Sequence, residues 1–251
     1  MCDRLLGAVL AVSLLAQPRD LRAQGDASRD TTRARRSVPT IALSFAAGAS
    51  VAAGFDGGWR RTITGTGPQS STPLRDAAHI GNTWGSPGAI VAAGALWLGA
   101  RVLHDTVRAK LGGRALEALA LSGIITGGIK GIAGRARPYA DPGHPDDWAL
   151  ARGIRNDSYQ SFPSGHSTAA FAFASAITAE LQHDHAPIAR WAGPVLYSLA
   201  AVTAFGRTYY NKHWLSDVVA GAGVGTVSGL IVVRWHAAHP KSWIDGVLLG
   251  R

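Results

Sequence analysis

Charged side chains are scarce in this chain, and cysteine is almost absent. Asp, Glu, Lys and Arg make up 16% of the 251 residues, whereas soluble domains carry about 25%. The one cysteine, Cys2, can form neither an intramolecular disulfide nor a cysteine-ligated metal site. The sequence also lacks zinc-finger, basic-zipper and aromatic RNA-binding signatures. Its net charge of +9 therefore favours anionic lipids or phosphorylated substrates over nucleic acid.

The N-terminal residues resemble an export signal. Arg4 precedes a short apolar stretch at 5–16, and small residues such as Ala16 and Ala23 suit cleavage. The next segment, 24–37, is polar and rich in Arg and Asp, which is typical of a flexible linker. We therefore expect a signal peptide at 1–23, a linker at 24–37 and a helical domain at 38–251. The alternative is an uncleaved anchor, although the apolar stretch is short for a membrane span.

Six apolar blocks follow, and none shows the strict alternation of a half-buried strand. Their lengths lie between those of a buried soluble helix and of a full membrane span. Abundant Gly and Ala permit close helix contact, as in membrane bundles. The sequence therefore predicts an all-α, six-helix bundle that is membrane-embedded or membrane-associated, with loops at 56–87 and 139–162. The predicted helices are 38–55, 88–103, 115–129, 167–181, 188–205 and 218–233.

Three polar clusters interrupt this apolar sequence. Since the helices are predicted to alternate in direction, the third and fifth end where the fourth and sixth begin. All three clusters are therefore expected at one end of the bundle. They are Lys130 with Arg135, Arg137 and Pro138; Pro163, Ser164, Gly165 and His166; and Gly206, Arg207, His213 and Asp217.

The residue types in these clusters suit phosphoryl transfer. Guanidinium and ammonium groups bind phosphate oxygens, and the free N–H groups at the start of a helix point at the same anion. His213 and Asp217 are four residues apart, hence on one helical face. The carboxylate can accept a hydrogen bond from one imidazole nitrogen and leave the other free to attack phosphorus. His166 can then protonate the leaving oxygen, and the cations stabilise the transition state without a metal.

The same residues resemble the motifs of the type 2 phosphatidic acid phosphatase superfamily. That superfamily includes lipid phosphatases, bacterial acid phosphatases and vanadium-dependent haloperoxidases. The resemblance lies in K-x6-R-P, P-S-G-H and R-x5-H-x3-D, and it covers about a third of the chain. It implies a general acid at His166, a nucleophile at His213 and an orienting carboxylate at Asp217. It also implies a phosphate site formed by Lys130, Arg137, Ser164, Gly165 and Arg207.

Two features depart from a simple match. Gly206 stands where the family often has serine before the arginine of the third motif, which removes one hydroxyl contact. Arg135 lies within the first cluster, but the motif does not require it. Neither departure changes the roles above.

The expected function is a phosphatase acting on a lipid-linked phosphate monoester or diphosphate, such as undecaprenyl diphosphate or phosphatidate, through a phosphohistidine intermediate. We expect no cofactor and no metal, because the acidic loop around His144, Asp146 and Asp147 is typical of a solvated turn. One alternative is a soluble periplasmic acid phosphatase of broad specificity, and a haloperoxidase ranks third. A six-helix transporter or anion-binding membrane protein is the alternative from another class, but its ionisable groups should lie near mid-membrane.

The orientation of the site depends on two conflicting arguments. Basic residues collect at the opposite end of the bundle, and the positive-inside rule makes that end cytoplasmic. A cleaved signal peptide with six spanning helices would instead place the site in the cytoplasm. We favour a cell-envelope protein whose site faces the periplasm. The basic residues are Arg33, Arg35, Arg36, Arg101, Arg108, Lys110, Arg114 and Arg190.

Overall fold

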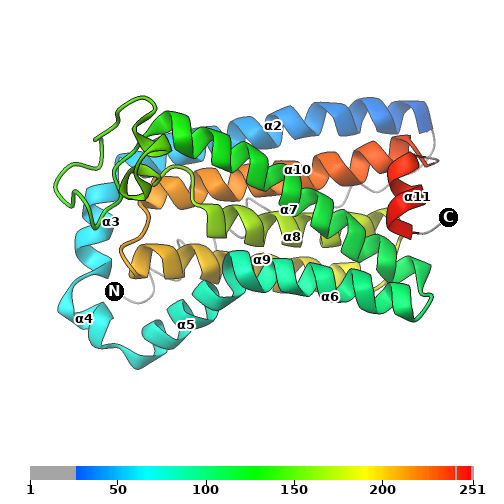
Figure 1. Cartoon of the computed structure of the whole chain (residues 1–251), viewed down its shortest axis with the longest axis horizontal. Coiled ribbons are helices and arrows are strands. Elements are labelled where there is room, and N and C mark those ends of the chain that lie inside the picture. Colours follow the sequence, from blue (N-terminus) through cyan, green and yellow to red (C-terminus); the bar gives the residue numbers. More distant parts are fainter. Residues whose placement is uncertain (1–26, 241, 250–251) are drawn as a thin grey trace.

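A computed structural model describes residues 27–240 and 242–249, with side chains from Val38 onward. The predicted signal peptide at 1–23 lies outside the described residues. Within them the chain is helical and forms no strand, which confirms the all-α prediction. The long helices lie side by side along the long axis of the molecule (Figure 1).

Each of the six predicted blocks is a helix. They are α2 (Ala27–Ala53), α6 (Ala89–Val102), α7 (Thr106–Ala133), α8 (Gly165–His183), α9 (Ala189–Tyr209) and α10 (Leu215–Ala238). α2 begins at Ala27, within the segment 24–37 for which the sequence predicts a linker. A short helix, α11 (Trp243–Leu249), follows α10 and was not predicted.

The prediction that 56–87 is mainly a loop is wrong. The segment forms α3 (Asp56–Ile63), α4 (Thr66–Ser70), α5 (Thr72–Thr83) and the π-helical turn η1 (Trp84–Gly88). Its Gly, Ser, Thr and Pro content lowers helix propensity. Pro73, however, stands in the first turn of α5, where proline is compatible with a helix, and α5 packs against α9.

The centre of the bundle is the pair α8 and α10, which pack closely through small residues. Gly221, Gly225 and Gly229 recur every fourth residue on one face of α10. A Cβ at Gly225 would lie 2.2 Å from the backbone oxygen of Thr168 on α8, so only glycine permits this approach. α2 and α7 pack on α10, while α9 packs on α8.

Two of the described helices, α7 and α10, are long and apolar enough to cross a membrane, and α2 with α3 is a third candidate if this pair, bent by 67°, forms one span. The exposed side of α7 carries large apolar residues, among them Ile124, which is 75% exposed. Such a surface suits contact with lipid and supports a membrane location.

The segment between α7 and α8 is a long connection, as predicted. It contains only the 3₁₀ turns η2 (Arg152–Ile154) and η3 (Asp157–Tyr159). Figure 1 shows this segment at one end of the bundle and α11 at the other. We call these the site end and the far end.

Candidate active site

The three polar clusters lie together at the site end, as their helix order predicts. The charges of Lys130, Arg137 and Arg207 all act on the imidazole of His166, and those of Lys130 and Arg137 also act on His213. Lys130 stands in the last turn of α7, and Arg207 near the end of α9.

The start of α8 faces this group of cations. Ser164 is the N-cap of α8 and is fully buried, and its own N–H donates to the backbone oxygen of Asp217 (3.0 Å). A Cβ on Gly165 would lie 3.7 Å from Cε of Lys130, so the ammonium group lies beside the first turn. The first N–H groups of a helix have no partner within the helix and carry partial positive charge. The first turn of α8 can therefore bind an anion beside Lys130.

The three cations differ in how far they are already paired. Lys130 donates to the backbone oxygen of Gln160, and Arg207 donates through Nη1 to the amide oxygen of Asn82. Within the described residues, the buried Nε of Arg207 has no hydrogen-bond partner. Arg137 pairs with Asp157, whose side chain is 75% exposed. Among the described residues, these three cations form no ion pair with a buried carboxylate.

His213 lies in the connection between α9 and α10 and is 4% exposed. Its Nδ1 is 2.7 Å from the backbone oxygen of Ser161. Because a carbonyl oxygen can only accept, Nδ1 carries the proton and Nε2 keeps a free lone pair. Burial lowers the pKa of His213 to about 3, and the charges of Lys130 and Arg137 act in the same direction. The imidazole is therefore neutral near pH 7, as a nucleophile must be.

Asp217 lies in the first turn of α10 and is fully buried. Its Oδ2 is 3.6 Å from Nδ1 of His213, which exceeds a hydrogen-bond distance. The carboxylate instead accepts from the side chains of Arg135 (2.6 Å) and Ser161 (2.5 Å) and from the backbone N–H of Trp214 (2.8 Å). The carboxylate lies beside the imidazole, but its hydrogen-bond partners are other groups.

The sequence predicts no role for four residues of this network. Asp56 and Asn82 lie in the segment predicted as a loop, and their sequence neighbours give no signal. Arg135 belongs to the first polar cluster, but the family motif does not require it, and Ser161 stands two residues before Pro163 of the P-S-G-H motif. The isolated bridge between Arg135 and Trp148 belongs to the same region.

Gly206 has a packing reason that the sequence does not reveal. A Cβ at this position would lie 2.7 Å from the backbone oxygen of Ala78 on α5. α5 and α9 approach too closely here for serine, so the missing hydroxyl follows from the way α5 packs. The same packing brings Asn82 of α5 to Arg207.

The structure thus brings two histidines and three cations together at one end of a helical bundle. The model of the PAP2 superfamily matches residues 111–241, which is just over half of the chain. The chain therefore belongs to the PAP2 superfamily, and the predicted resemblance is confirmed.

Curated relatives match shorter stretches. The chain is 38% identical over 69 residues to "Lipid A 1-phosphatase" of Porphyromonas gingivalis, covering 28% of this chain and 15% of that protein. It is 38% identical over 82 residues to "Putative undecaprenyl-diphosphatase YbjG" of Escherichia coli, covering 32% and 38%. It is 30% identical over 132 residues to "Probable lipid phosphate phosphatase beta" of Arabidopsis thaliana, covering 45% and 59%. The chain thus spans less than two thirds of each of these proteins. No solved structure matches.

Proposed function

We propose that this protein is a phosphatase that hydrolyses a lipid-linked phosphate monoester or diphosphate through a phosphohistidine at His213. The observation that carries the proposal is a neutral, buried imidazole whose Nε2 keeps a lone pair, beside cations that form no ion pair with a buried carboxylate among the described residues. The names of the relatives, all phosphatases of lipids or lipid-linked phosphates, support the substrate class.

In the proposed reaction, Nε2 of His213 attacks phosphorus, and the bond from phosphorus to the leaving oxygen breaks. His166 gives a proton to that oxygen. Burial and the charges of Arg207, Lys130 and Arg137 lower its pKa to about 4 in the free protein, and the negative charge of the bound phosphate raises that pKa so that His166 takes up the proton on substrate binding. Lys130, Arg137, Arg207 and the first turn of α8 stabilise the charge on the equatorial oxygens. Water then attacks the phosphohistidine, His166 takes up its proton, and phosphate leaves. Fixed cations supply the electrostatic stabilisation, so this mechanism needs no metal.

The mechanism is tested with a ³²P-labelled substrate and purified protein in the presence of EDTA. We expect turnover with EDTA and an acid-labile, base-stable phosphoprotein after a rapid quench. The label should be absent in His213→Ala and present in His236→Ala, a buried histidine at the far end. Strict dependence on an added divalent metal, or label retained in His213→Ala, would refute the mechanism.

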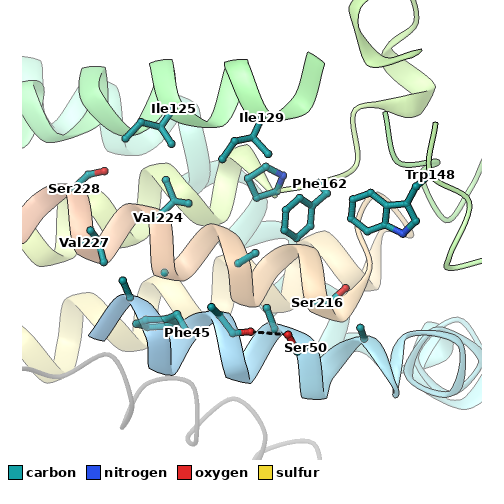
Figure 2. A pocket seen from close by; sticks show the side chains of 17 residues that line it. Phe45, Ser50, Ile125, Ile129, Trp148, Phe162, Ser216, Val224, Val227 and Ser228 are labelled. Carbon is teal, nitrogen blue, oxygen red and sulfur yellow. Dashed lines mark hydrogen bonds between the residues drawn. The ribbon is translucent and has the colours of Figure 1, made fainter. Parts of the chain in front are cut away.

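An apolar groove beside the site supports a lipid-linked substrate. It has a volume of about 560 Å³ and lies between α2, α7 and α10. Figure 2 shows Ile125 and Ile129 of α7 along one side, Phe45 of α2 opposite, and Phe162 and Trp148 at one end. Phe162 adjoins Pro163 of the P-S-G-H motif, so a hydrocarbon chain in the groove would lie next to the site.

Filling the groove tests its role. Val224→Trp places a large ring among the groove residues, and we expect kcat/KM to fall about tenfold for a lipid phosphate, because about 1.4 kcal/mol of apolar burial is lost. A small soluble phosphate ester should be hydrolysed at the unaltered rate. Ile124→Trp, on the exposed side of α7, is the matched control. An equal loss for both substrates would argue for the soluble, broad-specificity alternative.

We further propose that the site faces the periplasm, because the basic residues at the far end favour a cytoplasmic location for that end. Lys110 and Arg114 contribute less to this argument than a residue count implies, because they pair with Glu180, Asp184 and Asp245. Protease cleavage of an epitope inserted at 139–162, in intact spheroplasts, is the expected result. Protection of that epitope, with cleavage only after lysis, would place the site in the cytoplasm.

A further inference from the structure

The imidazole of His213 is held by a backbone carbonyl and not by the neighbouring carboxylate. Nδ1 lies 2.7 Å from the oxygen of Ser161 and 3.6 Å from Oδ2 of Asp217. The carbonyl oxygen therefore fixes both the tautomer and the direction of the ring. Asp217 contributes its negative charge from a slightly greater distance.

Ser161 links the imidazole to the carboxylate. Its backbone oxygen faces His213, while its hydroxyl donates to Oδ2 of Asp217 (2.5 Å). The residue is fully buried. Its backbone N–H donates to the backbone oxygen of Arg135 (3.1 Å). All three polar groups of Ser161 are thus used within one network, and two of them act on the catalytic pair.

Arg135 holds the other side of the carboxylate. It is 2% exposed and donates to Oδ1 of Asp217 (2.6 Å) and to Asp56 (2.7 Å). The guanidinium also donates to the hydroxyl of Ser216 (2.7 Å), and it lies over the ring of Trp148 at 4.7 Å. Such a group is fixed in place by its many partners. It cannot reach a substrate without leaving two buried carboxylates unpaired.

Building on the proposed function, we propose that Ser161 and Arg135 are positioning residues for His213. Ser161 holds the imidazole in the tautomer with Nδ1 protonated. Arg135 fixes Asp217 and the backbone of Ser161 in place beside that imidazole. Neither residue touches the phosphoryl group. Arg135 therefore belongs to the nucleophile's support and not to the phosphate site.

Ser161→Ala is the first test, because it removes the hydroxyl and keeps the carbonyl. We expect kcat to fall about 10- to 100-fold with KM nearly unchanged, since a small misplacement of a reacting group has a cost of this order. Without the hydroxyl's bond to Asp217, the Ser161 carbonyl is held less firmly against Nδ1. In ¹⁵N-histidine-labelled full-length protein, the Nδ1 and Nε2 signals of His213 should therefore change from one tautomer to a mixture. His213→Gln identifies those signals by their loss.

Ser175→Ala is the matched control. Ser175 is also a fully buried serine, whose hydroxyl donates to the backbone oxygen of Thr226 (2.8 Å) in the middle of the bundle. Its loss should lower the melting temperature like that of Ser161 and leave both kcat and the His213 tautomer unchanged. If Ser161→Ala behaves as Ser175→Ala does, the role of Ser161 is purely structural and the proposal is overturned.

Arg135→Lys tests the second residue. A lysine keeps one positive charge but cannot donate to Asp217, Asp56 and Ser216 at once, so we expect a similar fall in kcat and a mixed tautomer. If this variant does not fold, kcat and the His213 tautomer are measured instead in Asp56→Asn, which removes one ion pair of Arg135. A wild-type tautomer and kcat in the folded variant would remove Arg135 from the proposal. The tautomer is measured on the resting protein, so it remains informative even if the wild type hydrolyses no phosphate ester.

Discussion

The two ends of the bundle bury the same kinds of residue but balance their charges differently. At the far end Arg114 pairs with Asp245 (2.6 Å) and Glu117 (3.2 Å), and Lys110 pairs with Glu180 and Asp184 (both 2.8 Å). Every one of these cations meets a carboxylate, as is usual for buried charge.

Among the described cations of the site end, Arg135 pairs with the buried carboxylates Asp56 and Asp217, whereas Arg137 and Arg152 pair with the more exposed Asp157 and Asp147. Lys130 and Arg207 have carbonyl and amide oxygens as their partners among the described residues. The comparison separates two uses of buried charge. The ion pairs of the far end join α7 to α8, α10 and α11. At the site end, the proposed function uses the positive charge of Lys130 and Arg207 to bind the phosphate of the substrate.

The two ends also contain one buried histidine each, and removing them should give the largest contrast. His213→Ala should lower kcat at least about 10³-fold, because it deletes the attacking group, and the loss of its bond to the buried Ser161 carbonyl should lower the free energy of unfolding by about 1–3 kcal/mol. His236→Ala should leave kcat within about twofold, but it breaks the bond to Glu117 (2.7 Å) and should lower the free energy of unfolding by about 1–3 kcal/mol.

These two variants are compared by initial rates on a lipid phosphate and by thermal unfolding in the same detergent. Equal activity losses in both would mean that the histidines act through the fold alone.

A buried arginine at each end, Arg207 at the site end and Arg114 at the far end, should show the same contrast, with a smaller effect on the rate. Arg207→Gln should lower kcat/KM about 10²- to 10³-fold through lost transition-state stabilisation, without lowering stability, because it removes a buried cation that lacks a carboxylate. Arg114→Gln leaves buried carboxylates unpaired and should reduce stability by about 3–5 kcal/mol. The remaining folded fraction should keep wild-type kcat. A strongly destabilised Arg207→Gln would contradict the proposed surplus of charge.

The pH profile depends on the nucleophile's surroundings. The pKa of His213 is lowered to about 3, so its imidazole stays neutral and reactive well below the usual histidine pKa of about 6.5. Protonation of His213 should inactivate the enzyme only as the pH falls towards that lowered value. We therefore expect no loss of kcat/KM near pH 6.5 that can be assigned to His213. If Ser161→Ala moves the acidic limb of the kcat/KM profile to higher pH, the imidazole of His213 has become more basic or more exposed.

Much of the fold was predictable because the helices repeat a simple pattern. Apolar blocks without strand alternation predicted all six long helices, and their order predicted which ends meet. α5 could not be predicted in the same way, because its residues have low helix propensity. It is stabilised by tertiary packing on α9, where Gly206 permits close approach.

The candidate site was predictable only as far as its residues form motifs. Lys130, Arg137, Ser164, Gly165, His166, Arg207, His213 and Asp217 lie together at the site end as the motif order predicts, and their catalytic roles stay predictions. Asp56 was not predictable, because its pairing with Arg135 bridges residues 79 apart in the sequence. The partner of Nδ1 was predicted to be Asp217, since the i,i+4 spacing places both on one face. A backbone carbonyl such as that of Ser161 leaves no trace in a sequence.

The smallest expected effect concerns the exposed carboxylate next to the site. Asp157 pairs with Arg137 through an oxygen 3.1 Å away, and its side chain is 75% exposed, so it competes weakly with phosphate for the guanidinium. Asp157→Asn should tighten inhibition by inorganic phosphate about two- to fivefold, the range of an exposed ion pair. Asp184→Asn at the far end, which loses its pairing with Lys110, should leave phosphate inhibition unchanged. If both variants shift it equally, the effect comes from net charge, and the two ends do not differ in the way proposed.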